Sequence, residues 1–159
     1  MPDDWVGILK GLSKKDVAPK EDVGPKEDIR PHWDEFYGVA PERLPRGLSP
    51  LVKRFGPGLR QMLQERGLPG RLLELGPGLG EDLRAFKAVG LECVGVDITA
   101  EGFKAGGLLK DLEIPLVLGD NRRPLPFRDG AFGACYSHLV LSCDFGEEEL
   151  RGCFEEITR

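Results

Sequence analysis

The 159 residues amount to about one domain, with 40% hydrophobic residues to form a core and 31% charged residues for its surface. A formal net charge of −5 argues against a nonspecific nucleic-acid binder, which needs many Lys and Arg contacts to phosphates, although a local patch is enough to meet an RNA or protein substrate. No apolar run is long enough to span a membrane, and the acidic start at Met1–Asp4 is unlike a signal peptide.

Residues 1–31 are predicted to form a flexible arm. Lys15 to Pro31 contain the short repeat KDVAP-KEDVGP-KEDIRP, with prolines at three positions six residues apart. One apolar residue in six cannot build a core, and each proline removes a backbone donor and fixes φ. We expect an extended segment that serves as a linker or as a docking segment.

Residues 32–69 are predicted to form a helical cap. The aromatic and acidic cluster His32–Gly38 predicts a short helix or turn packed on the main body, with a lid over a small-molecule site as its functional interpretation. Ser49-Pro50 predicts the start of a helix, because Ser caps and Pro suits the first turn. The Gly56–Gly58 triplet is expected to interrupt this helix, and a second amphipathic piece should end at Gly67.

Residues 70–159 alternate between strand and helix patterns. Strands are predicted at Arg71–Leu75, Glu92–Val96 and Leu116–Leu118 and within 132–141; helices are predicted at Glu81–Val89, at 100–110 and at Glu147–Thr158, the last with Leu150, Cys153, Phe154 and Ile157 on one face. Such alternation predicts an α/β fold with a mostly parallel sheet covered by helices on both faces.

The four cysteines, Cys93, Cys135, Cys143 and Cys153, form no CxxC pair. A zinc site needs closely spaced ligands, so no metal is predicted and the thiols are expected to be reduced. Reduced thiols and the lack of a signal peptide favour a cytoplasmic setting.

The segment LLELGPGLGEDL, residues 72–83, carries the strongest functional signal. Alternate glycines after a strand allow a tight turn and close approach of the backbone to a ligand. Asp97 then ends the second predicted strand, where a carboxylate can accept both hydroxyls of an adenosine ribose. A nicotinamide cofactor and S-adenosylmethionine fit these two features equally.

Two further features separate these cofactors. Glu81 and Asp82 follow Gly80 where a dinucleotide fingerprint has its final glycine. Together with Glu74 they make the loop acidic, which is unfavourable for a pyrophosphate at a helix N-terminus and favourable for a sulfonium and an ammonium group. These features favour S-adenosylmethionine over a nicotinamide cofactor.

The series ELGPGLG, VGVDIT, LGDNRRPLPFRDGAF and CYSHLVL resembles the small class I S-adenosylmethionine-dependent methyltransferases over about residues 70–158. The resemblance implies a Rossmann-like sheet in strand order 3-2-1-4 behind N-terminal helices. It also implies S-adenosylmethionine as cofactor and methyl transfer by in-line displacement, and the acidic charge favours a small-molecule acceptor.

The resemblance also assigns cofactor contacts, but no catalytic residue. Glu74 would hold the methionine end, and the loop of Gly76, Pro77, Gly78 and Gly80 would lie beneath the cofactor. Asp97 would bind the ribose and Ile98 the adenine face. The adenine amino group would meet Asp120 beside the Asn121 backbone, and the transferable methyl group would lie near Ser137 and His138, just past the fourth strand.

The sequence departs from the family pattern in two places. Gly133 follows Phe132 where the family has an acid, which is expected to loosen the start of the fourth strand. A Pro-Gly-Gly turn and three further strands, which the family has after the last helix, are absent, so a sheet edge and a helix face should be uncovered.

Three interpretations follow: a shortened chain, a chain completed by a second copy or a partner subunit, and a degenerate member. The alternative function is a non-catalytic S-adenosylmethionine-binding module or pseudoenzyme completed by a partner subunit.

Overall fold

A parallel sheet forms the centre of the molecule. The structure, a computed structural model, describes residues 27–39, 44, 46–107, 114–143 and 145–159. Its strands are β1 (Arg71–Leu75), β2 (Glu92–Asp97), β3 (Leu116–Leu118) and β4 (Ala134–Ser137). They pair in the order β3-β2-β1-β4, with Leu73 of β1 opposite Val94 on one side and Cys135 on the other. The predicted α/β class and strand order are confirmed.

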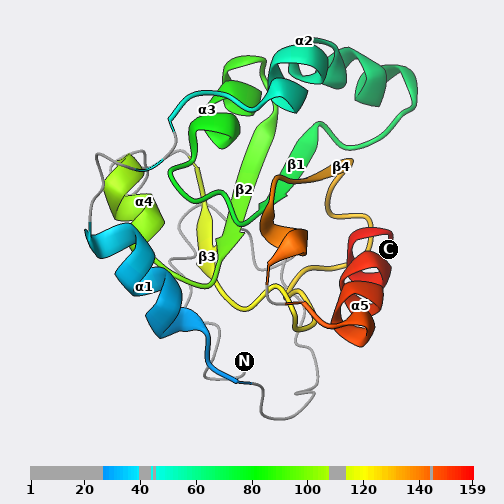
Figure 1. Cartoon of the computed structure of the whole chain (residues 1–159). Coiled ribbons are helices and arrows are strands. Elements are labelled where there is room, and N and C mark those ends of the chain that lie inside the picture. The colour runs from blue at the N-terminus through cyan, green and yellow to red at the C-terminus, as the bar shows by residue number, and fades with distance from the viewer. Residues whose placement is uncertain (1–26, 40–43, 45, 108–113, 144) are drawn as a thin grey trace.

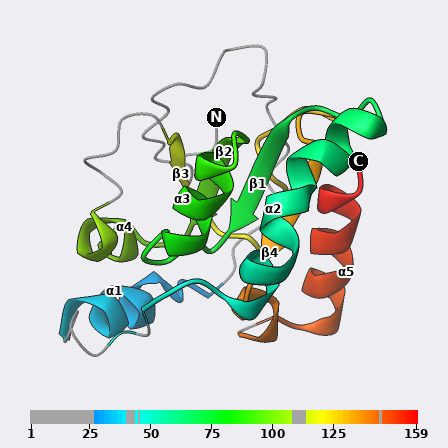
Figure 2. The same ribbon diagram turned by 90° about the horizontal axis from the view of Figure 1, so that it is seen from above.

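Helices surround this sheet (Figures 1 and 2). They are α1 (Arg30–Val39), α2 (Pro50–Glu65), α3 (Glu81–Ala88), α4 (Glu101–Gly106) and α5 (Glu147–Ile157), with the short 3-10 helix η3 (Val140–Ser142) after β4. In both views α1 lies beside α4, and α5 lies on the β4 side of the molecule. The predicted helix over 100–110 is observed as α4, which ends at Gly106; residues 108–110 lie outside the described part.

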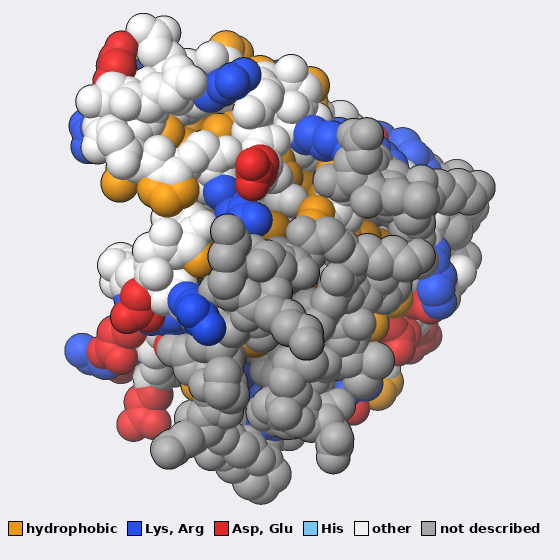
Figure 3. Space-filling model, turned by 180° about the vertical axis from the view of Figure 1, so that it is seen from behind, with side chains coloured by type: hydrophobic (Ala, Val, Ile, Leu, Met, Phe, Trp, Pro, Cys, Tyr) orange, Lys and Arg blue, Asp and Glu red, His pale blue; other side chains and the backbone are white. Residues whose placement is uncertain are grey.

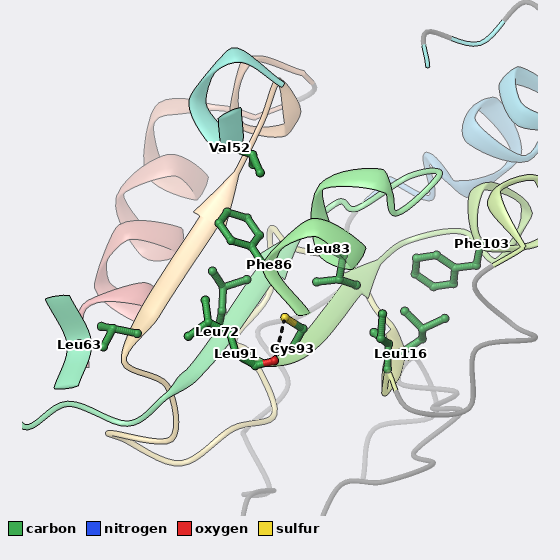
Figure 4. Packing of buried hydrophobic residues seen from close by; sticks show 10 residues of the cluster. Val52, Leu63, Leu72, Leu83, Phe86, Leu91, Cys93, Phe103 and Leu116 are labelled. Atoms are coloured by element: carbon green, nitrogen blue, oxygen red, sulfur yellow. Dashed lines mark hydrogen bonds between the residues drawn. The ribbon is translucent and has the colours of Figure 1, made fainter. Parts of the chain in front are cut away.

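Alternating residues of the strands form two cores, one on each face of the sheet. Leu72 and Cys93 face α2, α3 and α4, where they pack with side chains such as Phe86 and Phe103 (Figure 4). The neighbouring Leu73 and Val94 face the other way; there they belong to a cluster with Phe127 and with Cys153 of α5. Helices therefore cover both faces, as the alternation of elements predicts.

α2 differs from its prediction, because it runs without a break through the Gly56–Gly58 triplet. Val52, Gly56 and Leu63 are buried along one side of α2, and a β-carbon at Gly56 would lie 3.4 Å from Val52 and 3.8 Å from Phe86. These are ordinary contact distances, so close packing does not require glycine here. The burial of this side of α2 is the tertiary packing that overrides the helix-breaking tendency of Pro57. The predicted start is confirmed, since the Val52 amide donates to the Ser49 hydroxyl over 3.1 Å.

Two smaller expectations also need correction. Gly133 does not loosen the start of β4: its amide donates to the Arg71 carbonyl over 2.9 Å, and a β-carbon there would clash with the Pro69 carbonyl. Close packing, not flexibility, is therefore the reason for glycine at this position. On α5, Cys153 is buried but Phe154 is 52% exposed, because Phe154 lies at the margin of the buried face.

The N-terminal arm predicted for residues 1–31 lies outside the described residues, apart from 27–31. The helical cap predicted for 32–69 contains α1, which begins at Arg30, and α2. The four cysteines are free, with Cys93 and Cys153 buried. Among the helices that the structure describes, none has the length and apolar character that crossing a membrane requires.

Candidate functional site

A cavity of about 390 Å³ opens where the β-strands end, and it collects most of the residues singled out in the sequence. Of those residues, the following line the cavity: Glu74, Gly76, Pro77, Gly78, Gly80, Asp97, Ile98, Asp120, Asn121 and His138. We call the strand tips and the glycine loop, residues 74–80, 97–98 and 120–121, the floor of the cavity. Ligands of open parallel sheets bind at this end of the strands.

The glycine loop is held tightly between β1 and α4. Gly78 has a φ of +49°, a conformation that favours glycine, and a β-carbon there would lie 2.7 Å from the Tyr37 hydroxyl. Gly102 and Gly106 of α4 face the same loop: a β-carbon at Gly102 would lie 2.8 Å from the Gly78 carbonyl oxygen, and one at Gly106 would clash with the Leu79 carbonyl. The glycines that weaken α4 as a helix therefore let it approach the loop.

Asp97, at the end of β2, is positioned by backbone amides. Its carboxylate accepts hydrogen bonds from Gly78 N and Thr99 N, both over 3.2 Å. Burial raises the pKa of Asp97 to about 6, although these amides oppose the shift. The Ile98 backbone is a third donor; because a carboxylate offers about four acceptor positions, some capacity remains for a ligand in the cavity.

Glu74, in β1, is a buried acid with an unused acceptor. Glu74 is only 3% exposed, and its Oε2 atom has no hydrogen-bond partner among the described residues. Burial raises its pKa well above the ordinary value, and the charges of Asp82 and Asp97 raise it further. A cation that brings N–H donors into the cavity would relieve both costs.

Glu81 and Asp82, the two acids at the start of α3, accept hydrogen bonds from the segment that precedes α2. Glu81 accepts a hydrogen bond from Gly47 N, and Asp82 accepts from Ser49 N over 2.8 Å and from the Tyr136 hydroxyl over 2.9 Å. The Ser49 and Tyr136 hydroxyls are themselves 2.6 Å apart. These acids therefore connect the start of α2 to α3 and β4, in addition to making the cavity negative.

Two polar side chains follow β3, and they differ in their hydrogen bonding. The Asp120 carboxylate accepts a bidentate interaction from Arg122, with Nη2 2.8 Å from Oδ2 and Nε 3.0 Å from Oδ1. Asn121 is buried, and its Oδ1 has no hydrogen-bond partner within the described residues. Asp120, expected to meet the adenine amino group, thus already has a protein partner.

A second part of the lining, which we call the roof, consists of the α1 aromatics Trp33, Phe36 and Tyr37 together with Leu139 and Val140. Asp34 accepts a hydrogen bond from the Thr99 hydroxyl, which ties α1 to the end of β2. The aromatic cluster signalled this wall in the sequence. Leu139 gave no signal: it is 70% exposed and adopts a φ of +69°, which is strained for a non-glycine residue.

Ser137 and His138 behave differently from each other. Ser137 is the last residue of β4, opposite Leu75, instead of lying just past the strand. It does not line the cavity, and its hydroxyl is buried without a partner among the described residues. His138 lines the cavity and is exposed.

The chemistry of the floor is that of an acceptor-rich, negative site. Glu74, Asp97 and Asn121 all present oxygen acceptors from successive strand tips, so the site suits a ligand with several donors and a positive charge. Within the described ranges, no group of three or more His, Cys, Asp or Glu side chains is arranged to hold a metal ion.

Solved structures of known proteins share this fold. A putative S-adenosyl-L-methionine-dependent methyltransferase from Methanococcus maripaludis is 13% identical, with a TM-score of 0.54 over 87% of this chain and 64% of that one. The CcbJ methyltransferase from Streptomyces caelestis is 18% identical, with a TM-score of 0.60 over 84% of this chain and 55% of that one. A structure concerned with the conversion of a disulfide bond into a thioacetal group during echinomycin biosynthesis is 17% identical, with a TM-score of 0.60 over 82% and 56%.

The chain thus spans less than two thirds of the length of these three solved chains. No curated protein matches the sequence. The family described as "Methyltransferase domain" matches residues 73–159, more than half of the chain and all of the strands β2, β3 and β4. The chain therefore belongs to the class I S-adenosylmethionine-dependent methyltransferases.

Proposed function

We propose that the chain binds S-adenosylmethionine in the cavity and transfers its methyl group to a small-molecule acceptor by in-line displacement. The observation that carries the proposal is the buried, unpartnered Oε2 of Glu74 at the floor of the cavity. An unpaired buried acceptor costs free energy unless a ligand supplies a donor. The ammonium group of the methionine moiety is such a donor, and its charge suits the carboxylate.

The other contacts follow from the order of the strand tips. Glu74 in β1 would hold the methionine end above Gly76, Pro77, Gly78 and Gly80. Asp97 in β2 would accept the ribose hydroxyls with its free lone pairs, and Ile98 would pack on adenine. The tip of β3, at Asp120 and Asn121, then faces the edge of the base.

The protein's contribution to methyl transfer is alignment. When bound, S-adenosylmethionine supplies an electrophilic methyl group on a positively charged sulfur. The floor fixes the position of that methyl group, and the roof excludes water and orients an acceptor toward it. His138 and Ser137 come from the end of β4, which pairs with β1, the strand that carries Glu74. We assign neither of them a proton transfer, because His138 is exposed and Ser137 does not line the cavity.

The roof and the surface support a small molecule as acceptor. Trp33, Phe36, Leu139 and Val140 offer apolar contacts of the kind that line small-molecule sites. On the face seen in Figure 3, acidic and basic side chains of the described residues are interspersed and do not gather into one basic patch. The solved structure concerned with echinomycin biosynthesis gives a small-molecule precedent on this fold.

A second candidate function is binding without turnover, alongside a partner subunit. The observation that favours it is β4, which forms an edge of the described sheet and whose residues are all only half-buried. A smaller cavity of about 140 Å³ beside it is lined by Leu125, Phe127 and Ile157. Formation of S-adenosylhomocysteine by the chain alone, with any acceptor from a small-molecule panel, would exclude this candidate.

Thermal melting with S-adenosylhomocysteine tests the binding proposal. A ligand that binds only the folded state stabilises it by about 2.7 kcal/mol at 100 times its Kd. For a domain of this size, that free energy raises the melting temperature by about 5 °C or more. NAD⁺ at the same concentration is the control for the nicotinamide alternative and should have no effect. A folded sample that shows no shift with millimolar S-adenosylhomocysteine would refute the proposal.

A further inference from the structure

The tip of β3 contains an acid whose hydrogen-bonding capacity is already used. Asp120 Oδ1 accepts from the Arg122 backbone amide over 2.9 Å and from Nε over 3.0 Å, while Oδ2 accepts from Nη2 over 2.8 Å. A carboxylate offers about four acceptor positions, and Arg122 fills most of them. The Arg122 side chain is only 7% exposed, so solvent competes little for the pair.

The next residue, Asn121, differs from Asp120 because its side-chain oxygen is buried without a hydrogen-bond partner among the described residues. Asn121 is 8% exposed and lines the same cavity, yet its Oδ1 has no hydrogen-bond partner within the described part of the chain. Leaving a buried amide oxygen unpaired costs about 1–3 kcal/mol. Buried polar groups in folded proteins are almost always paired, so the unpaired oxygen points to a donor that arrives with the ligand.

The strand order identifies that donor. The sheet runs β1, β2, β3 away from Glu74, so Asn121 lies beyond Asp97 and Ile98 on the side away from the methionine end. If Asp97 holds the ribose, the base extends toward β3. The donor that adenine carries on its edge is the exocyclic 6-amino group.

We propose that the side-chain Oδ1 of Asn121, and not the carboxylate of Asp120, accepts the adenine 6-amino group. Arg122 is a positioning residue that keeps Asp120 engaged and thereby fixes the turn that follows β3. The inference rests on the proposed function. It replaces the contact that the family resemblance implies for Asp120 with a contact from a neutral amide.

The experiment compares two ligands, S-adenosylhomocysteine and its analogue in which hydrogen replaces the 6-amino group. Isothermal titration of the unaltered chain should give about tenfold tighter binding for S-adenosylhomocysteine, because one buried hydrogen bond is gained. In Asn121→Ala this ratio should fall to about one, whereas in Asp120→Asn it should remain about tenfold. Comparing two ligands on the same variant cancels any change in the stability of that variant.

Asn121→Leu provides a second variant if the alanine variant folds poorly. Leucine has the same number and branching of side-chain heavy atoms as asparagine but no unpaired acceptor, so folding should be preserved while the ratio again falls to about one. A ratio that persists in both Asn121 variants and collapses in Asp120→Asn would overturn the inference and leave the proposed function intact. Failure of the unaltered chain to bind either ligand would instead overturn the proposed function and the inference with it.

Discussion

The floor and the roof of the cavity are built on different principles. The floor uses hydrogen-bonding groups with spare capacity: Glu74 Oε2 is unpartnered among the described residues, and Asp97 keeps some acceptor capacity beside its backbone donors. The roof uses apolar and aromatic surface from Trp33, Phe36 and Leu139. Hydrogen bonds to fixed groups select one chemical structure, whereas apolar surface selects by shape. Under the proposed function, the floor would hold the cofactor and the roof would contact the acceptor.

The largest effect on ligand affinity is expected when a substitution removes the negative charge of Asp97 from the floor. Asp97→Asn should weaken S-adenosylhomocysteine binding about 100-fold, because charge-assisted hydrogen bonds to two ribose hydroxyls become weaker. The new amide group also turns an N–H toward Gly78 N or Thr99 N, which are donors already. Isothermal titration calorimetry measures the change.

A roof substitution is the matched control. Phe36→Leu alters a half-exposed aromatic of the cavity wall that has no polar atom in its side chain. Such a change should alter S-adenosylhomocysteine affinity by about threefold or less. If both substitutions weaken binding equally, the division between floor and roof is wrong.

The floor was predictable because it is local in sequence. Its residues lie at the carboxyl end of a strand or in the loop that follows, and parallel strands bring these ends to one edge, so the tips of β1, β2 and β3 had to meet. A buried apolar run followed by Gly76, Asp97 or Asp120 was therefore enough to place those residues.

The roof and the pairings within the floor were less predictable, because they depend on contacts between distant segments. The approach of Tyr37 to Gly78 and the hydrogen bond from Thr99 to Asp34 join α1 to the sheet, and no periodicity encodes either. The Asp120–Arg122 pair is only two residues apart, yet it depends on a turn geometry that residue types do not reveal. Gly133 likewise suggested a loosened strand start until its close neighbour, the Pro69 carbonyl, was known.

A second prediction tests the backbone packing beneath the floor. Gly106→Ala should destabilise the fold by about 2 kcal/mol, because its β-carbon would clash with the Leu79 carbonyl and push α4 from the glycine loop. Gly152→Ala in α5 is the control: a β-carbon there has nothing within 4 Å, so the higher helix propensity of alanine should stabilise by about 0.5–1 kcal/mol. Urea unfolding of both variants measures the difference. Equal effects of the same sign would show that α4 does not need its close approach.

The smallest expected effect is a pH dependence confined to the floor. Burial raises the pKa of Asp97 from 3.8 to about 6 in the unliganded chain, so the folded state binds the proton more tightly than the unfolded state. This group therefore makes the fold less stable as pH rises from about 4 to 6. Ribose hydroxyls favour the ionised carboxylate, so S-adenosylhomocysteine affinity should rise about tenfold from pH 5 to 7, as the ionised fraction does.

Asp97→Asn separates the two buried acids in this pH profile. The pKa of Glu74 is raised in the same direction, by burial and by the neighbouring Asp82 and Asp97, so its ionisation also favours an ammonium ligand at higher pH. Titrations of the variant at pH 5, 6 and 7 should therefore lose the part of the rise that comes from Asp97, and a rise that remains is the contribution expected from Glu74. Affinity that is flat in the unaltered chain, or that falls with rising pH, would mean that neither carboxylate contacts the ligand in its charged form. The floor would then bind by shape, as the roof does, and the distinction between them would fail.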